Sequence, residues 1–147
     1  MNTKDWGPKM WYSLHTIAYN YEPTPENRKH YKQFYVSLKD MLPCKYCRQS
    51  WKDFLTELPI DKFLDSKKSM TFWIYLMHNK VNKKLRDQGN PIPKDPSYEE
   101  ICKKYEAIRA DCSNPGLTCS KKSPGSNDTL TRLPFIALFV FSLYNLI

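Results

Sequence analysis

Apolar side chains recur every three or four residues through much of this chain, and no stretch alternates between apolar and polar residues. In the first such stretch, Trp11, Leu14, Ala18 and Tyr21 would share one side of a helix. Strands show a period of two residues, whereas helices show a period of about 3.6. The pattern therefore predicts an all-α fold.

Five helices are expected from the turn and capping signals between these stretches. They would occupy residues 5–21, 25–42, 45–58, 69–85 and 97–109. Thr24 before Pro25 is typical of a helix start, and Ser97 with Glu100 forms a capping box. Pro59 ends the third helix. The faces expected to be buried carry Tyr31, Phe34, Tyr35, Leu38 and Met41 in the second helix and Trp51, Phe54, Leu55 and Leu58 in the third.

Two cysteines, Cys44 and Cys47, stand behind Pro43 at the expected start of the third helix. A helix N-terminus carries partial positive charge, which favours a thiolate over a thiol. Lys45 and Arg48 add positive charge nearby. This arrangement favours a redox dithiol that opens and closes as a disulfide. Half of a zinc site and a pair of core cysteines are the alternatives, and the lack of strands argues against a thioredoxin-like fold.

Composition excludes some partners and some ligand sites. The chain has 147 residues and a formal charge of +8, but its lysines and arginines are spread out and accompany no nucleic-acid-binding motif. Nucleic acid is therefore not expected as a partner. The four glycines are scattered, which excludes a Rossmann turn or a P-loop.

Polar residues interrupt the apolar side of the expected fourth helix. His78 and Asn82 lie four residues apart on that side, and Asn79 flanks them, while His15 borders the apolar stripe of the first helix. A buried polar group costs about 1–3 kcal/mol if it is left unpaired. Either the backbone of another helix or a ligand rich in hydrogen-bonding atoms must satisfy them, and His15 is open to the further interpretation of a satisfied core histidine.

The last part of the chain differs in character. Cys112 and Cys119 bound a polar loop, and residues 120–129 form a Ser/Lys/Gly/Asn linker that is expected to be mobile. Residues 133–147 are nearly all apolar, and as a helix they would span about 22 Å against the roughly 30 Å of a bilayer core. We expect a C-terminal tail anchor, and the alternative is a helix that docks on a partner or a sister subunit. The N-terminus has no apolar signal-peptide core.

Three motifs in order carry a family resemblance. They are Trp6-Gly7-Pro8-Lys9-x-Trp11-x-x-Leu14-His15-x-x-Ala18, Pro43-Cys44-x-x-Cys47, and Trp73-x4-His78-Asn79-x-Val81-Asn82-x-x-Leu85. Together they resemble the Erv/ALR family of flavin-linked sulfhydryl oxidases over about residues 5–110. The compact N-terminus is similar to the versions carried by large cytoplasmic DNA viruses.

The resemblance implies a four-helix bundle plus a short fifth helix, usually dimeric, with FAD beside the CxxC pair and no metal. It implies a FAD-binding oxidase domain at residues 1–110, a flexible cysteine-containing arm at 111–129 and a hydrophobic C-terminal segment at 130–147. By motif matching, the cofactor contacts would be Gly7, Pro8, Lys9, Trp11, His15, Tyr19, His78, Asn79, Val81, Asn82, Lys83, Leu85 and Tyr105. Lys83 or Lys84 would lie near the phosphates.

The resemblance also implies a reaction. A protein dithiol, or a thioredoxin-like relay protein, would attack the disulfide at Cys44 and free Cys47 beside the flavin, which passes the electrons to oxygen to give hydrogen peroxide. Cys112 and Cys119 would form a shuttle pair, and a structural disulfide is their alternative. Leu58 and Tyr75 stand where cellular relatives carry a structural disulfide, and Cys102 is expected to be a free thiol.

Two other functions remain open from the sequence. Cys44, Cys47, Cys112 and Cys119 would hold zinc in a metal-binding interaction module. The second possibility is a membrane-tethered structural protein that kept the helical bundle and lost the enzymatic activity. The expected location of the catalytic domain is the cytosol, which means the host cytoplasm or the virion if the protein is viral.

Overall fold

Helices capped by polar side chains make up the first of two compact units. The computed structural model describes residues 2–111 and 120–121. Residues 1–109 form one unit and residues 110–147 the other. The predictions for Cys112, Cys119, residues 122–129 of the linker and the apolar segment at 130–147 lie outside the described residues.

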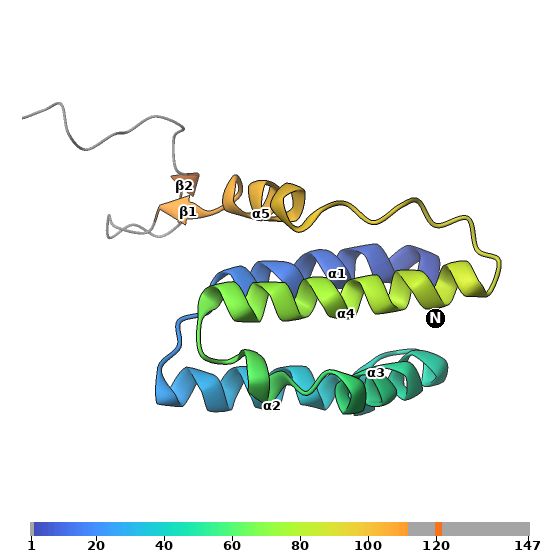
Figure 1. Cartoon of the computed structure of the whole chain (residues 1–147), viewed down its shortest axis with the longest axis horizontal. Coiled ribbons are helices and arrows are strands. Elements are labelled where there is room, and N and C mark those ends of the chain that lie inside the picture. Colours follow the sequence, from blue (N-terminus) through green and yellow to red (C-terminus); the bar gives the residue numbers. More distant parts are fainter. Residues whose placement is uncertain (1, 112–119, 122–147) are drawn as a thin grey trace, which may run out of the picture. The chain divides into compact units, whose positions relative to one another are not determined.

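Five α-helices and one 3₁₀ helix build the first unit (Figure 1). They are α1 (Thr3–Tyr19), α2 (Pro25–Met41), α3 (Lys45–Glu57), η1 (Ile60–Phe63), α4 (Lys67–Asp87) and α5 (Tyr98–Glu106). The predicted all-α bundle of four helices with a short fifth is therefore confirmed. None of the helices described here is both long and apolar enough to cross a membrane.

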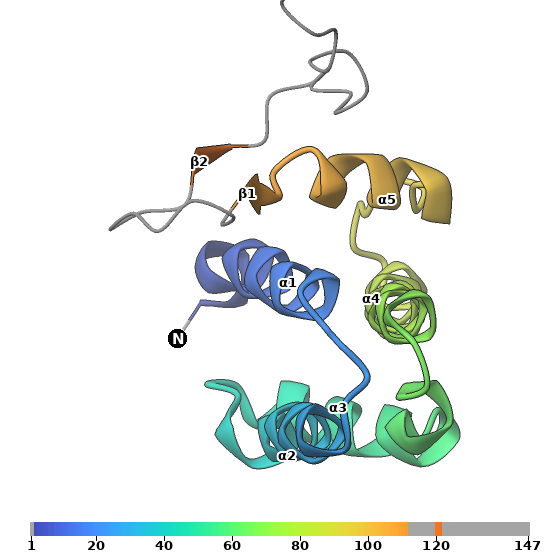
Figure 2. The same cartoon turned by 90° about the vertical axis from the view of Figure 1, so that its left-hand side faces the viewer.

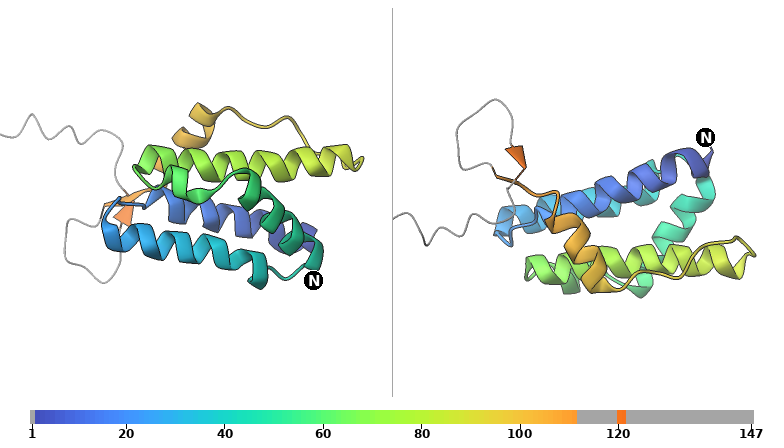
Figure 3. Two further views of the ribbon diagram at one scale, coloured as in Figure 1. Left: turned by 60° about the horizontal axis from the view of Figure 1, so that its bottom comes forward. Right: turned by 90° about the horizontal axis from the view of Figure 1, so that it is seen from above.

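The helices lie in three levels. α1 packs along α4, and α2 packs against α3 on one side of this pair (Figure 2). α5 contacts both α1 and α4 on the other side. The chain leaves α4 and runs back along it before α5 begins, so that α5 crosses over the α1–α4 pair (Figure 3). This path brings residues from α1, α4 and α5 to one place.

Side-chain caps start the helices where the sequence places them. The Thr24 side chain accepts a hydrogen bond from the Asn27 N–H, and Ser97 and Glu100 form the predicted capping box. α4 begins two residues before the predicted Ser69, because Ser66 caps it by accepting from the Ser69 N–H. α5 ends at Glu106, three residues before the predicted end.

Aromatic residues form the centre of the helical core. Trp73 is fully buried, lies edge-on to Tyr35 and Trp51, and donates from Nε1 to the Leu58 carbonyl at 3.0 Å. Trp51 donates to the Tyr35 carbonyl at 2.8 Å, and Tyr35 donates to the Leu14 carbonyl at 2.7 Å. Because every polar tip finds a backbone oxygen, these rings bury large apolar surfaces without an unpaired group. The Trp73–Leu58 bond joins the end of α3 to α4.

Two predicted core residues of α2 are exposed. Met41 is 70% exposed and Phe34 is 38% exposed, so their assignment to the buried face was wrong. The buried stripe passes through Tyr35, Leu38 and Leu42, and the two residues lie beside it, since neighbours on a helix differ by about 100°.

The second unit contains a short antiparallel ladder. β1 (Ala110–Asp111) pairs with β2 (Ser120–Lys121), with Ala110 opposite Lys121 and Asp111 opposite Ser120. Two-residue strands are too short to show a sequence period, which explains why no strand was expected. The functional division of the chain near residue 110 stays a prediction.

Candidate active site

The start of α3 holds the two thiols in one helical turn. Cys44 is the N-cap residue, in extended conformation, and its Sγ accepts a hydrogen bond from the Cys47 N–H at 3.3 Å. Pro43 precedes it and pushes Leu42 out of helical conformation, so α2 ends and α3 can begin in a new direction. Both cysteines are half-buried free thiols.

The two thiols ionise unequally. A hydrogen bond from the Cys47 thiol lowers the pKa of Cys44, and the Arg48 guanidinium contributes in the same direction. Burial, together with the neighbouring Cys44, raises the pKa of Cys47 to about 12, while the Lys84 ammonium opposes this rise. Cys44 is therefore the thiol that becomes a nucleophile first, because the thiolate is the reactive form.

A stack of aromatic rings lies between α1, α4 and α5. Trp11 stacks on His78 with ring centroids 4.1 Å apart, and His15 stacks on Tyr105 at 4.9 Å. Tyr19 extends the stack on Tyr105 at 5.2 Å. The structure thus brings together five of the predicted cofactor residues from three separate helices.

The two histidines of this stack face each other. His15 Nε2 lies 3.2 Å from His78 Nδ1, close enough for one shared hydrogen bond. Burial, with a smaller contribution from the Lys104 ammonium, lowers the pKa of His15 to about 3 and that of His78 to about 4. Both rings are therefore neutral near pH 7. His15 Nδ1 is buried and has no hydrogen-bond partner among the described residues.

Trp51 connects the stack with the dithiol. Its ring lies 5.9 Å from that of Trp11, and it stands one turn after Cys47 on α3. Cys47 itself packs against the hydrophobic core to which Trp51 belongs. Trp51 was predicted as a core residue, but its position between the two parts of the site was not predicted. Its spacing of four residues from Cys47 was the available signal.

Asn82 finds its partner in the loop after α4. Its Nδ2 donates to Asp95 Oδ1 at 2.8 Å, and Arg86 donates to both oxygens of the same carboxylate at 3.1 and 2.6 Å. The Arg86 guanidinium holds the pKa of Asp95 below its ordinary value. The expected partner of Asn82 was another helix's backbone or a ligand, and a loop carboxylate fills that role instead. Asp95 was not among the predicted site residues.

The remaining predicted cofactor residues lie along α1 and α4. Asn79, Val81 and Leu85 are half-buried on the turns around Asn82, whereas Lys83 is exposed and pairs with Asp87 at 2.6 Å. Gly7 and Pro8 lie in the first turns of α1, and a Cβ added at Gly7 would meet nothing within 4 Å.

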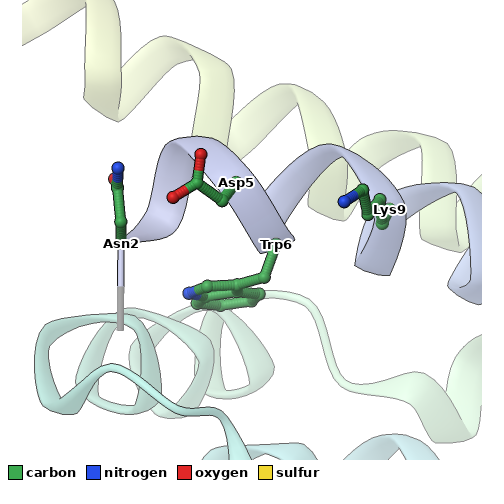
Figure 4. A pocket seen from close by; sticks show the side chains of 4 residues that line it. All are labelled: Asn2, Asp5, Trp6 and Lys9. Atoms are coloured by element: carbon green, nitrogen blue, oxygen red, sulfur yellow. The ribbon is translucent and has the colours of Figure 1, made fainter.

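A hollow of about 290 Å³ lies beside these first turns of α1, lined by Asn2, Asp5, Trp6 and Lys9 (Figure 4). Trp6 Nε1 is buried there without a hydrogen-bond partner among the described residues. The predicted cofactor residue Lys9 therefore lines the same hollow as Trp6, whose Nε1 is a second unsatisfied polar atom. This atom and His15 Nδ1 both belong to α1.

Comparison with known proteins assigns the family. The model of the Erv1 / Alr family matches residues 8–105. The chain belongs to the Erv1 / Alr family. The match covers all three motifs of the sequence analysis from Pro8 onward, including the CxxC pair and the His78–Leu85 segment.

Several relatives carry names that state an activity. An African swine fever virus protein named FAD-linked sulfhydryl oxidase is 34% identical over 82 residues, which are 54% of this chain and 67% of the relative. A mimivirus protein named probable FAD-linked sulfhydryl oxidase is 34% identical over 85 residues, 56% of this chain and 59% of the relative. The mitochondrial FAD-linked sulfhydryl oxidase ERV1 of Saccharomyces cerevisiae is 32% identical over 82 residues, 54% of this chain and 42% of the relative.

Two solved structures of yeast Erv1 have a fold similar to that of this chain. The yeast Erv1 core has a TM-score of 0.62 at 26% identity, covering 71% of this chain and 84% of that one. The FAD binding domain of yeast Erv1 has a TM-score of 0.60 at 28% identity, covering 71% of this chain and 97% of that one. The helical unit described above is therefore the part that this chain shares with these relatives.

Proposed function

We propose that this protein is a FAD-linked sulfhydryl oxidase that forms disulfides in protein substrates. The observation that carries the proposal is the reactive dithiol of α3 next to an aromatic site with an unsatisfied buried histidine. Family membership supports the same activity, because the relatives named above are FAD-linked sulfhydryl oxidases.

The residues of the aromatic site fit a flavin nucleotide. Its flat, uncharged rings need aromatic faces and a few polar atoms. The site offers five aromatic rings, and one of them carries His15 Nδ1, which has no hydrogen-bond partner among the described residues. Trp11, His15 and Tyr19 from α1 would hold the rings together with His78 and Tyr105. When bound, FAD supplies an acceptor for the electron pair of the reduced dithiol and passes it to oxygen, which gives hydrogen peroxide.

The dithiol performs the exchange with the substrate. A substrate thiolate attacks Sγ of Cys44 in the Cys44–Cys47 disulfide, so the S–S bond breaks and Cys47 leaves as a thiolate. The second substrate thiolate then attacks the mixed disulfide and releases Cys44. The substrate is thereby oxidised to a disulfide and the Cys44–Cys47 pair is reduced by two electrons. Cys44 suits the outer role, since Met41 and Tyr46, which are near it in sequence, are each 70% exposed, whereas Cys47 packs against the hydrophobic core.

Several finer features belong to the same proposal. Cys112 and Cys119 would relay electrons from the substrate to Cys44 within a homodimer, with a protein dithiol or a thioredoxin-like protein as the donor. The apolar segment at 130–147 would anchor the protein to a membrane with the catalytic unit in the cytosol. These features rest on the sequence, namely a second cysteine pair after the bundle and a nearly uninterrupted apolar end.

The first test is flavin content. Purified protein truncated near residue 126 should be yellow, consume oxygen when a dithiol is added, and release hydrogen peroxide. Cys47→Ser should keep the flavin and lose the oxygen consumption. A colourless protein that does not bind added FAD would refute the proposal, and zinc bound in its place would favour the metal-binding module. For the tail, equal solubility of the full and truncated chains with membranes present would refute the anchor.

A further inference from the structure

The cationic side chains on the second half of α4 differ in their partners. Three of the four pair with carboxylates: Lys80 with Glu57, Lys83 with Asp87, and Arg86 with Asp95. Lys84 contacts the Ser50 hydroxyl of α3 instead, and no carboxylate pairs with it among the described residues. Among the residues that the structure describes, no neighbouring anion therefore neutralises its positive charge.

Ser50 holds this ammonium on the side of α3 that carries Cys47. The two residues are three positions apart on the helix, so their side chains are neighbours on one face. The buried Ser50 hydroxyl donates to the Tyr46 carbonyl at 2.8 Å. Since the hydroxyl hydrogen is used in this bond, the Ser50 oxygen is free to accept a hydrogen bond from Lys84.

The charge acts on Cys47. The Lys84 ammonium lowers the pKa of Cys47, against burial and against the negative Cys44 thiolate, which raise it. When Cys44 forms a mixed disulfide with the substrate, its sulfur has no charge and no proton. Only burial then opposes the Cys47 thiolate, and Lys84 is the neighbouring cation that compensates for it.

We propose that Lys84, held by Ser50, is the positioning cation that stabilises the Cys47 thiolate when a substrate thiolate opens the Cys44–Cys47 disulfide. In this step the negative charge moves from the substrate sulfur to Cys47 Sγ as the new S–S bond to Cys44 forms. A lower pKa of the leaving thiol speeds such an exchange. The inference rests on the proposed oxidase function, and it assigns Lys84 to the dithiol rather than to the phosphates of a cofactor.

The test measures the ionisation of Cys47 directly. In the full-length chain carrying Cys44→Ser, which leaves position 44 uncharged, the rate of iodoacetamide alkylation is followed against pH on the peptide that contains Cys47. Adding Lys84→Gln should move the rate profile to higher pH and slow alkylation at a fixed mildly alkaline pH by roughly tenfold, the effect of losing a nearby opposite charge. Lys84→Arg should retain the original profile.

Lys80→Gln is the matched control, because Lys80 lies one turn earlier on α4 and is paired with Glu57. Its profile should not move. Lys84→Met keeps the aliphatic stem and serves as a second neutral variant if Lys84→Gln unfolds. A profile that is unchanged in the neutral variants would overturn the proposal, as would an equal shift in Lys84→Arg. Alkylation needs neither flavin nor turnover, so a failure of the oxidase proposal would be seen separately.

Discussion

Acid should destabilise this protein strongly, because folding keeps two histidines neutral. Burial lowers the pKa of His15 to about 3 and that of His78 to about 4, from an ordinary value of 6.5. His15 is 1% exposed, and the nearby Lys104 ammonium also disfavours protonation. The Asp95 carboxylate raises the pKa of His78, but this effect is smaller than the lowering caused by burial.

The size of the effect follows from proton linkage. Below the unfolded-state pKa, the unfolded chain binds a proton on each histidine and the folded chain does not. Stability is therefore complete above about pH 6.5 and falls as the pH drops toward the folded-state values. At about pH 5 the loss is ~2 kcal/mol for each histidine and ~4 kcal/mol for both. This is a large part of a typical domain stability of about 5–15 kcal/mol.

Urea unfolding of flavin-free protein at about pH 8 and about pH 5 measures this loss as a change in midpoint. His15→Gln should roughly halve the pH dependence, whereas the exposed His30→Gln should leave it unchanged. Arg86 lowers the pKa of Asp95 below its ordinary value of 3.8. The contribution of Asp95 to stability is therefore lost only below that pH, outside the range compared here. Wild-type protein that loses less than ~1 kcal/mol, or His15→Gln protein that loses as much as wild type, would refute the reasoning.

Three further changes have distinct expected results. Cys47→Ser should reduce oxygen consumption with a dithiol to background while leaving the bound flavin absorbance intact, and residual turnover would contradict the role of the dithiol. Asp95→Asn should weaken FAD binding by roughly tenfold in a fluorescence titration, because it removes charge-assisted bonds worth about 1.5–3 kcal/mol that hold Asn82; unchanged affinity would contradict this. Ser97→Ala should lower the free energy of unfolding, measured with urea, by about 1 kcal/mol, because it removes the cap of α5. Oxygen consumption should be unaffected.

Local signals predicted the helices well, since they act within a few residues. The Thr24–Pro25 start and the Ser97–Glu100 box both depend on bonds between a cap side chain and a nearby backbone N–H, and both are present. Phe34 and Met41 show the limit of such reasoning. The apolar residues of α2 cover more of its circumference than α2 buries, and only packing against α3 and α4 selects the buried ones.

Site residues on a single helix could be predicted from the sequence, whereas the contacts between helices could not. His78 and Asn82 were recognised from their polarity on an apolar face, but their partners come from α1 and from the loop after α4. The path of that loop decides that Asp95 reaches Asn82, and no residue pattern specifies this path. The contact of Lys84 with Ser50 likewise depends on how α4 packs on α3.

The structure separates two electrostatic environments along the length of α4. At His78, burial keeps two imidazoles neutral, which suits an uncharged aromatic ligand and excludes a fixed positive charge. At Lys84, fewer than two turns further on, the charge has no carboxylate partner among the described residues and lies toward the dithiol. In the proposed exchange Lys84 stabilises the Cys47 thiolate at the second place, and Trp51, one turn after Cys47, packs near Trp11 of the first. Exchanging the two environments would place a cation in the aromatic site and leave Cys47 protonated, so the order of His78 and Lys84 along α4 is itself a requirement of the proposed chemistry.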